Sequence, residues 1–330
     1  MVKAYNVAIV GATGMVGREI LKILEERHFP ATNLYLFATA RSADTIISWN
    51  GGNYTVEELT QESFKKSGGI DIALFSAGGD TSLRFAPIAV ENGCTVVDNS
   101  SAWRMDESVP LVVPEVNPDD LARHKGIIAN PNCSTIQAVV ALNPLHKVYH
   151  LKRIVYATYQ AVSGAGMGGW RDLESGGAPT TFPFPIKGNC IPHIGDFCDN
   201  GYTKEEMKMI TETRKILHEP ELRVTATTVR VPVFTGHSEA INAEFEKPFE
   251  LDAVAALLKN SPGVTVLDGK GGVAPYPMPL YAQGTDDVYV GRIRRDASVE
   301  NGLSMWVVSD NLRKGAASNA VQIAERLTKI

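Results

Sequence analysis

The first 130 residues alternate between short apolar runs and stretches with helical spacing. Four continuous apolar runs predict buried strands at 5–10, 33–39, 71–79 and 94–101. A helix is predicted after the first run, because its apolar positions recur every three or four residues: Val16, Ile20, Ile23 and Leu24. A second helical pattern covers 81–93. Strands that alternate with helices indicate a doubly wound parallel sheet.

The pattern changes beyond residue 130. Alternating apolar and polar positions predict strands at 151–164, 221–234, 238–247, 286–295 and 302–311. Helices are predicted at 203–218 and 250–260, where they would cover one face of a mixed, largely antiparallel sheet, and a final helix ends the chain. Residues 163–200 are rich in glycine and proline and weakly periodic, which is typical of a functional loop or an interface arm.

The length of the chain fits two domains, since 330 residues exceed what one hydrophobic core usually supports. We predict an α/β protein with an N-terminal Rossmann-like domain and a second α+β domain for substrate binding and dimerisation. The nucleotide domain would comprise 1–131 together with the C-terminal helix 312–330. Residues 132–311 would form the catalytic and dimerisation domain.

Composition excludes several classes of function. The net charge of −5 is too small to favour a nucleic-acid partner, and no apolar run is long enough to span a membrane. The first strand begins almost at the N-terminus, which leaves no room for a signal peptide. Four cysteines in 330 residues do not form a disulfide framework, so a cytoplasmic protein is expected. Cys190 and Cys198, with His193 between them, match no common zinc spacing, and no metal is predicted.

A glycine-rich turn separates the first strand from the first helix, with the spacing Gly11-x-x-Gly14-x-x-Gly17. Thr13 takes the place of the middle glycine of the usual dinucleotide-binding pattern. Glycines after a strand sometimes only turn the chain. Here, however, the following helix N-terminus would supply N–H donors to a pyrophosphate, so a dinucleotide site is predicted.

The end of the second strand indicates which dinucleotide binds. Sites that prefer NAD usually place an acidic residue there, whereas this strand ends with Thr39, Arg41 and Ser42. A cation and hydroxyls suit the 2′-phosphate of NADP. The alternative is that Arg41 is a solvated loop residue.

Cys133 lies between a proline-containing turn and a predicted helix that starts at Ser134. A thiol at a helix N-terminus is a candidate nucleophile, because the helix dipole favours the thiolate and neighbouring N–H groups could hold an oxyanion. A small apolar residue packed at the helix end is the alternative, and these residues alone do not decide between the two.

Two further residues could complete an active site. Arg230 and His237 lie seven residues apart, with Thr235 and Gly236 able to turn the chain between strand-like runs. The arginine would bind a carboxylate through two hydrogen bonds, and the histidine would transfer a proton near neutral pH. Gln160 ends a strand beside a glycine loop and could equally be an ordinary polar residue.

The chain resembles aspartate-β-semialdehyde dehydrogenases nearly from end to end. The segments that carry this resemblance are VGATGMVGRE, FATARS, FSAGG, VDNSSAWRM, VPEVN, NPNCSTIQ, YQAVSGAG, NCIPHIGDF, GYTKEEMKM, ETRKIL, RVPVFTGHSEA and DNLRKGAASNAVQIAE. The segment GAGMGGWRDLESGG departs from the family, which often has a smaller, more helical run there.

The resemblance implies the reductive dephosphorylation of L-aspartyl-4-phosphate by NADPH to L-aspartate 4-semialdehyde, in lysine, diaminopimelate, threonine, methionine and isoleucine synthesis. Cys133 would form a thioester as phosphate leaves, His237 would act as acid and base, and Gln160 would orient the acyl group. Substrate contacts are implied for Arg104, Asn132, Glu205, Lys208 and Arg230. Glu239 is a further candidate for contact with the substrate or with the histidine.

These roles match the charges of the substrate. Arg230 would bind its carboxylate and Glu205 its ammonium, and Arg104, Asn132 and Lys208 would bind its phosphate. Without the resemblance, Glu205 and Lys208 would be interpreted as a pair on a helix surface.

Cofactor contacts follow from the same resemblance. In the N-terminal half they are Gly11, Thr13, Gly14, Met15, Val16, Thr39, Arg41, Ser42, Ser76, Ala77 and Gly78. A loop near the nicotinamide would contribute Ser163, Gly164 and Gly166, and Asn311 would join it.

Two other functions compete with this one. An N-acetyl-γ-glutamyl-phosphate reductase has an acylated, neutral substrate amine, for which Glu205 would serve no purpose. A catalytically inactive homologue that only binds nucleotide would not need Cys133, Gln160, Arg230 and His237 together. A homodimer is expected, with a homotetramer as the alternative, and the partners are the substrate and inorganic phosphate.

Overall fold

A computed structural model describes residues 4–269 and 276–329. The chain forms two compact units, Met1–Pro131 with Ala316–Ile330 and Asn132–Gly315. The chain passes between the units at Pro131–Asn132 and again at Gly315–Ala316. Residues 312–315 stay with the second unit because Gly315 packs against Cys133: a Cβ at Gly315 would lie 2.9 Å from the Cβ of the cysteine.

The first unit contains a seven-stranded sheet with the order β3-β4-β2-β1-β5-β6-β7. All neighbouring strands are parallel except β3 and β4, which form an antiparallel hairpin at one edge. The predicted doubly wound parallel sheet is therefore confirmed. The strands are β1 (Tyr5–Val10), β2 (Ala31–Ala38), β3 (Ile46–Trp49), β4 (Gly52–Glu58), β5 (Ile72–Phe75), β6 (Thr95–Asp98) and β7 (Ile127–Ala129).

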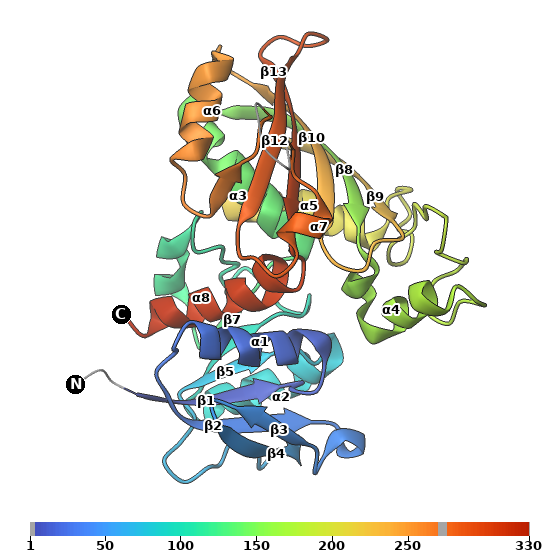
Figure 1. Cartoon of the computed structure of the whole chain (residues 1–330). Coiled ribbons are helices and arrows are strands. Elements are labelled where there is room, and N and C mark those ends of the chain that lie inside the picture. The colour runs from blue at the N-terminus through green and yellow to red at the C-terminus, as the bar shows by residue number, and fades with distance from the viewer. Residues whose placement is uncertain (1–3, 270–275, 330) are drawn as a thin grey trace. The chain divides into compact units, whose positions relative to one another are not determined.

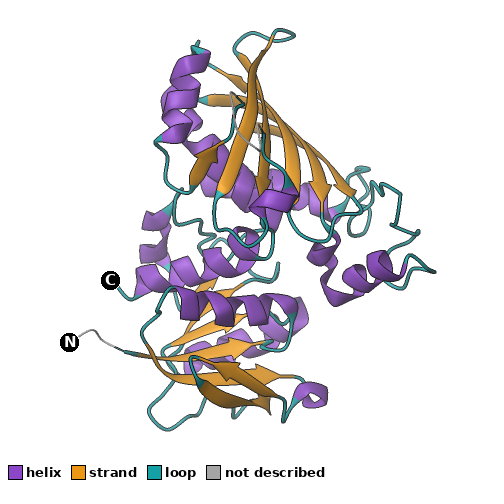
Figure 2. Cartoon of the chain, in the orientation of Figure 1, coloured by secondary structure: helices purple, strands orange, loops and turns teal. Residues whose placement is uncertain are grey.

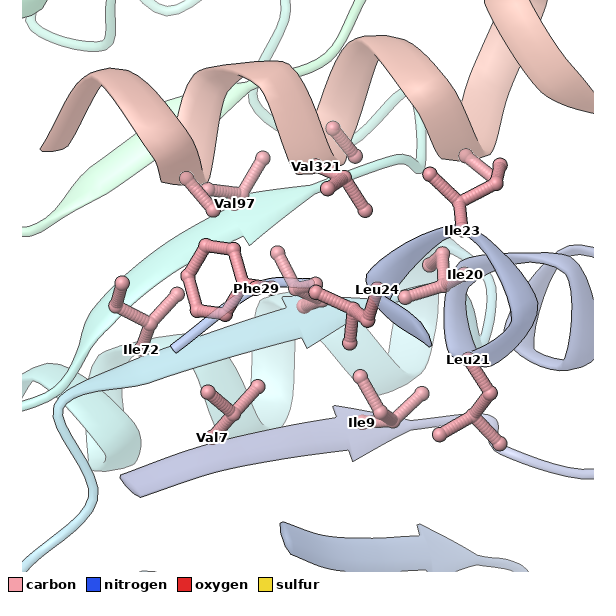
Figure 3. Close-up of a cluster of buried hydrophobic side chains, with 14 of the residues drawn as sticks. Val7, Ile9, Ile20, Leu21, Ile23, Leu24, Phe29, Ile72, Val97 and Val321 are labelled. Atoms are coloured by element: carbon pink, nitrogen blue, oxygen red, sulfur yellow. The ribbon is translucent and has the colours of Figure 1, made fainter. Parts of the chain in front are cut away.

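Each face of this sheet has its own hydrophobic core. Val7 and Ile9 of β1 pack with α1 (Met15–Glu26) and α8 (Ser318–Leu327), as Figure 3 shows. Ala8 and Val10 of the same strand belong to the cluster around α2 (Gly79–Glu91) on the opposite face. Successive residues of β1 face opposite sides of the sheet. Because both sides are covered, residues of both sets must be apolar, which explains the continuous apolar run.

The β3–β4 hairpin was not predicted from the sequence. Its burial alternates, with Ile47 and Trp49 buried and Ile46 and Ser48 exposed, as expected for an edge strand with one covered face. The indole of Trp49 donates a hydrogen bond to the carbonyl of Leu21 on α1, over 2.8 Å. This contact, the pairing of β4 with β2 and the burial of Ile47 and Trp49 in the core are long-range features that local periodicity does not show.

The second unit contains a six-stranded sheet with the order β11-β12-β13-β10-β8-β9. The pairs β8–β9 and β11–β12 are parallel and the other three are antiparallel, which confirms the predicted mixed sheet. The strands are β8 (Leu151–Gln160), β9 (Arg223–Arg230), β10 (His237–Phe245), β11 (Val264–Val266), β12 (Val288–Asp296) and β13 (Gly302–Ser309).

Helices cover one face of the second sheet (Figures 1 and 2). The central helix α3 (Cys133–Tyr149) packs against β10, β13 and β8, and α5 (Lys204–Leu217) and α6 (Leu251–Lys259) pack on α3. Residues 134–143 of α3 are all buried, as expected for a helix enclosed on every side. Helix α4 (Gly166–Ser175) follows β8, and α7 (Pro279–Ala282) precedes β12. Among the described residues, no helix is long and apolar enough to cross a membrane.

Candidate active site

The N-terminus of α3 carries Cys133 as its first residue. Asn132 caps the helix: its Oδ1 accepts hydrogen bonds from the backbone N–H groups of Ser134, at 3.0 Å, and Thr135, at 3.3 Å. The helix therefore starts one residue earlier than predicted. The N–H groups of Ser134 and Thr135 are bonded to the cap, and an oxyanion site at the neighbouring N–H groups stays a prediction. The side chain of Cys133 is half-buried.

Three strand termini bring the other predicted catalytic residues together. Gln160 ends β8 and Arg230 ends β9, and the two are register partners in the parallel pair. His237 begins β10 on the other side of β8. The turn between Arg230 and His237 does not join neighbouring strands, because β8 lies between β9 and β10. All three side chains are buried.

Gly164 lies where the side chains of Arg230 and His237 approach each other. A Cβ on this glycine would be 2.8 Å from Nη1 of Arg230 and 3.4 Å from Nε2 of His237. The guanidinium and the imidazole therefore approach the same point of the backbone. A glycine is required there because any side chain would displace one of them.

Arg230 is a buried cation with unused hydrogen-bonding capacity. Its Nη1 donates to the carbonyl of Ala161 over 2.6 Å, and its Nε has no partner among the described residues. Burial lowers the pKa of the guanidinium, and the neighbouring Glu205 and Cys133 act in the opposite direction. A buried N–H group without a partner is costly, so this site suits a bound anion such as a carboxylate.

His237 has a defined tautomer. Its Nδ1 accepts a hydrogen bond from the backbone N–H of Ala161 over 3.0 Å, so the neutral ring carries its proton on Nε2. Burial, together with the charge of Arg230, lowers the pKa of His237 to about 3, although Glu205 acts to raise it. The ring is therefore neutral at physiological pH. Its Nε2 is buried and has no partner among the described residues, so it can donate to a ligand.

Glu205 is the centre of a buried hydrogen-bond network in the first turn of α5. Its Oε1 accepts from Nδ2 of Asn132, at 2.8 Å, and from Nε2 of Gln160, at 3.0 Å. Its Oε2 accepts from Nζ of Lys208, at 3.0 Å. Burial by itself would raise the pKa of Glu205, but Lys208 and these hydrogen bonds lower it to about 2. Because the carboxylate is buried, the alternative of an exposed helix pair is wrong.

A capping box fixes the position of this carboxylate. The Oγ1 of Thr203 accepts from the backbone N–H of Glu206, and Oε2 of Glu206 accepts from the backbone N–H of Thr203. The cap starts α5 at Lys204, which directs Glu205 toward α3. A role of Glu205 in binding the substrate ammonium stays a prediction, as does phosphate binding by Asn132 and Lys208.

Two buried residues of this network were missed by sequence reasoning. Glu212 accepts a hydrogen bond from the backbone N–H of Asn132 over 2.7 Å, and Ser134 accepts one from Gln160 over 2.9 Å. Glu212 lies seven residues after Glu205 and therefore on the same face of α5. The seven-residue spacing of these two acidic residues, with Met209 between them on the same face, was the available signal.

Glu239 lies behind the first turn of α3. Its side chain is fully buried and faces Ser134 and Gln137, but neither carboxyl oxygen forms a hydrogen bond of good geometry within the described residues. Burial raises its pKa well above the usual value, which favours the neutral acid. The structure thus places Glu239 against the helix that carries Cys133, and substrate contact by this residue stays a prediction.

Arg104 belongs to the first unit and lies in the loop after β6. Its Nε donates to the carbonyl of Asn130 over 2.9 Å, and its Nη2 donates to the carbonyl of Asn99 over 3.0 Å. The side chain is buried, and these bonds fix the guanidinium at the carboxyl ends of β6 and β7. Its contact with a phosphate stays a prediction.

The predicted nucleotide turn forms a cradle at the carboxyl end of β1. Gly11 has a φ of +88°, and a Cβ there would lie 2.8 Å from the carbonyl oxygen of Ser76. A Cβ on Gly17 would overlap the carbonyl oxygen of Gly11. The helix N-cap, Gly14, provides no side-chain hydrogen bond, so the first N–H groups of α1 remain available to an anion. This cradle fits a pyrophosphate.

The other predicted cofactor residues of this unit lie at the same edge of the sheet. Thr39 and Arg41 follow β2 and are exposed, and Ser42 is half-buried beside them. Ser76, Ala77 and Gly78 follow β5, the other neighbour of β1. Thr13, Met15 and Val16 belong to the glycine turn and the first turn of α1.

The predicted nicotinamide loop lies in the second unit and is fixed by Asn311. The Oδ1 of Asn311 accepts from the backbone N–H of Gly236 over 2.9 Å, and its Nδ2 donates to Oγ of Ser163 over 2.9 Å. These bonds hold Ser163 and the neighbouring Gly164 beside the strand that begins at His237. Gly166, with a φ of +69°, starts α4.

The three cysteines outside the site are Cys94, which is buried, Cys190, which is exposed, and Cys198, which is half-buried. All four cysteines are thiols, and the ring of His193 stacks on Phe197 with a centroid distance of 4.4 Å. Residues 4–269 and 276–329 contain no group of three or more metal-ligating side chains.

Comparison with known proteins identifies the family. Two family models match, "Semialdehyde dehydrogenase, NAD binding domain" over residues 6–124 and "Semialdehyde dehydrogenase, dimerisation domain" over residues 142–314. The aspartate-semialdehyde dehydrogenase of Aquifex aeolicus is 56% identical to this chain, with 98% of each chain covered. The chain belongs to the aspartate-semialdehyde dehydrogenase family.

Solved structures of this family share the fold. Aspartate semialdehyde dehydrogenase II of Vibrio cholerae, solved as a complex with ASA, has a TM-score of 0.94 and 45% identity, with 99% of each chain covered. The enzyme of Candida albicans, solved with NADP, has a TM-score of 0.77 and 26% identity, with 98% of each chain covered. The sequence-based assignment to this family is confirmed.

Proposed function

We propose that this chain catalyses the NADP-dependent reductive dephosphorylation of L-aspartyl-4-phosphate to L-aspartate 4-semialdehyde and phosphate. The observation that carries the proposal is the meeting of Arg230 and His237 at Gly164, in the unit where Cys133 begins α3. The family membership of the chain supports the same reaction, as does the relative that was solved with ASA. The activity serves the synthesis of lysine, threonine, methionine and isoleucine.

Substrate binding follows from the charges of the site. The unpartnered Nε of Arg230 would donate to the carboxylate of the substrate in a site that excludes water. Glu205 would balance the ammonium group, and Lys208, Asn132 and Arg104 would bind the phosphate. Because Glu205 already holds Asn132, Gln160 and Lys208, it would also position the residues that contact the phosphate and the acyl group.

The chemical step begins with the thiolate of Cys133, which attacks the acyl carbon as phosphate leaves and so forms a thioester. Gln160 would orient the acyl group. The Nε2–H of His237 would donate to the oxygen or sulfur on which charge develops, because Nδ1 is occupied by the backbone N–H of Ala161. The thioester would then take up a hydride and a proton to become a thiohemiacetal. Collapse of the thiohemiacetal would release the aldehyde, and the proton of its hydroxyl group would pass to the sulfur of Cys133 and regenerate the thiol.

NADP(H) would bind at the glycine turn with its pyrophosphate at the N-terminus of α1, and would supply the hydride. Gly11 and Gly17 would shape this site, because they let the turn pack closely against the carbonyl of Ser76 and against α1. The preference for NADP over NAD rests on Thr39, Arg41 and Ser42, since β2 ends without an acidic residue that could bind a ribose 2′-hydroxyl. The presence of NADP in the Candida albicans structure supports this preference.

We also propose a separate function for each of the two units. Residues 1–131 and 312–330 would bind the cofactor, and 132–311 would carry catalysis and dimerisation. The match to a dimerisation domain supports a homodimer, with a tetramer as the alternative. The reaction, with its pyridine nucleotide and phosphorylated substrate, would take place in the cytoplasm.

The test is a spectrophotometric assay of the reverse reaction with L-aspartate semialdehyde, phosphate and NADP. We expect reduction of NADP that depends on phosphate, and a much lower kcat/KM with NAD. Protein that lacks this activity but reduces N-acetylglutamyl phosphate would overturn the proposal in favour of the related reductase.

Substitution of the nucleophile separates chemistry from packing. Cys133→Ala should abolish turnover and leave the Kd for NADPH within a few-fold of wild type, as measured by fluorescence titration. A collapsed melting curve with loss of cofactor binding would instead assign Cys133 a packing role.

The carboxylate site is tested by Arg230→Lys. We expect a higher KM and a lower kcat, because an ammonium group cannot replace the two parallel donors of a guanidinium. Unchanged kinetics would remove Arg230 from the active site.

A further inference from the structure

An arm, defined as residues 176–200, follows α4 and returns to the sheet beside Arg230. It contains no helix or strand, but it has a small hydrophobic core formed by Val162, Leu173, Ile186 and Ile191, with Phe182 packed against it. Ile186 is fully buried and Ile191 nearly so. The arm is therefore a packed part of the second unit.

Asp172 on α4 fastens the beginning of the arm. Its Oδ1 accepts from the backbone N–H and the hydroxyl of Thr180, both at 2.9 Å. Its Oδ2 accepts from the backbone N–H groups of Thr181, at 2.8 Å, and Phe182, at 3.2 Å. Desolvation alone would raise the pKa of Asp172, but these four hydrogen bonds outweigh it and lower the pKa to about 2. A single carboxylate thus holds three successive residues.

Two glycines on α4 allow the arm to pack this closely. A Cβ on Gly168 would overlap the hydroxyl of Thr181, and a Cβ on Gly169 would lie 2.9 Å from the ring of Phe182. Any side chain at these positions would push the arm outward. The unusual glycines of the segment GAGMGGWRDLESGG therefore serve to seat Thr181 and Phe182.

The seated arm contacts Arg230 in two places. The backbone N–H of Arg230 donates to the carbonyl of Ile191 over 2.8 Å, and the N–H of Ile191 donates back over 2.9 Å. The ring of Phe182 lies over the guanidinium, with 5.8 Å between its centroid and Cζ. This distance is within the range of a cation–π interaction. One face of the carboxylate-binding cation is thus covered by an aromatic ring of the arm.

We propose that Phe182, held in place by Asp172, is a positioning residue for substrate binding that covers Arg230 and keeps water from the substrate carboxylate. The inference rests on the proposed role of Arg230 in carboxylate binding. A guanidinium shielded on one face binds a carboxylate more strongly, because the ion pair is screened less by water. The arm thereby acts on substrate affinity, and the chemical step at Cys133 does not depend on it.

The experiment measures kcat and KM for L-aspartate semialdehyde in Phe182→Ala, Phe182→Leu and Phe182→Tyr. We expect Phe182→Ala to raise KM at least tenfold with kcat within threefold, and Phe182→Leu to raise KM several-fold because the π face is lost. Phe182→Tyr should restore the KM of wild type. Phe184, two residues along the arm and exposed, offers a matched control, and Phe184→Leu should leave both parameters unchanged.

Asp172→Asn tests the fastening independently. The amide nitrogen of asparagine cannot accept the hydrogen bonds from Thr181 and Phe182, so the variant should raise KM as Phe182→Ala does, with wild-type kcat. The proposal is overturned if Phe182→Leu and Phe182→Tyr both have the KM of wild type, or if the loss falls on kcat alone. If Phe182→Ala does not fold, the leucine and tyrosine variants decide. Wild-type protein inactive on the semialdehyde would instead refute the proposed function itself.

Discussion

Replacement of Glu205 by glutamine tests whether the network in the first turn of α5 stabilises the protein through a buried carboxylate. Glu205→Gln keeps the size of the side chain but removes the charge that accepts hydrogen bonds from Asn132, Gln160 and Lys208. At low pH the wild-type carboxyl is itself protonated, so wild type and variant should then become alike.

The magnitude follows from the pKa of Glu205, which falls from 4.5 to about 2 in the folded protein. Because the folded-state pKa is the lower one, the carboxylate stabilises the fold fully above about pH 5, and this contribution is lost as the pH falls toward 2. At about 1.4 kcal/mol per pKa unit, the stabilisation at pH 7 is about 3 kcal/mol. Roughly half of it should remain at pH 3.

The assay is urea unfolding of wild type and Glu205→Gln at pH 7, 5, 4 and 3, followed by circular dichroism. We expect a difference in the free energy of unfolding of about 3 kcal/mol at pH 7 that shrinks below pH 5. The control is Glu62→Gln, which removes an exposed i,i+3 pair with Lys65 at 2.8 Å and should leave stability unchanged. A difference that is independent of pH, or equal in both variants, would refute the reasoning.

Three other substitutions test the geometry of the sites. Gly164→Ala should lower kcat/KM about a hundredfold by displacing the guanidinium of Arg230. The control Gly177→Ala, in open surroundings, should have no effect. Wild-type kinetics in Gly164→Ala would disprove that Arg230 and His237 approach each other at Gly164. Gly17→Ala should weaken NADPH binding at least tenfold in a fluorescence titration, because its Cβ overlaps the preceding turn, and an unchanged Kd would contradict the cradle. Glu239→Gln should keep kcat within about twofold at pH 7, because burial raises the pKa of Glu239 and favours the neutral carboxyl that glutamine mimics. A large loss of kcat would show that the charge of Glu239 is required.

Local patterns predicted much of the fold because burial on both faces leaves a signature in the sequence. The continuous apolar run of β1 required covered faces, and the glycine turn after it required a tight approach of α1. The family and its reaction followed from ordered motifs along the chain. The same motifs identified Cys133, Gln160, Arg230 and His237 as candidate active-site residues before their positions in the fold were known. The β3–β4 hairpin escaped prediction because its burial depends on a distant helix.

Only the tertiary structure determined which site residues are buried and which groups they contact. Glu205 and Lys208 have the same spacing whether a helix face is exposed or buried, and the packing of α5 on α3 buries Glu205 while Lys208 stays half-buried. The sequence did not reveal that Asn132 caps α3 or that β8 separates Arg230 from His237. Strand order and helix contacts are not encoded in local periodicity. The sequence does not distinguish Phe182 from other aromatic residues in loops. Its hydrogen bond to Asp172 and its cation–π contact with Arg230 locate it beside the active site. The sequence by itself therefore determined the elements and the chemistry available to them, and long-range packing determined which polar groups are buried together.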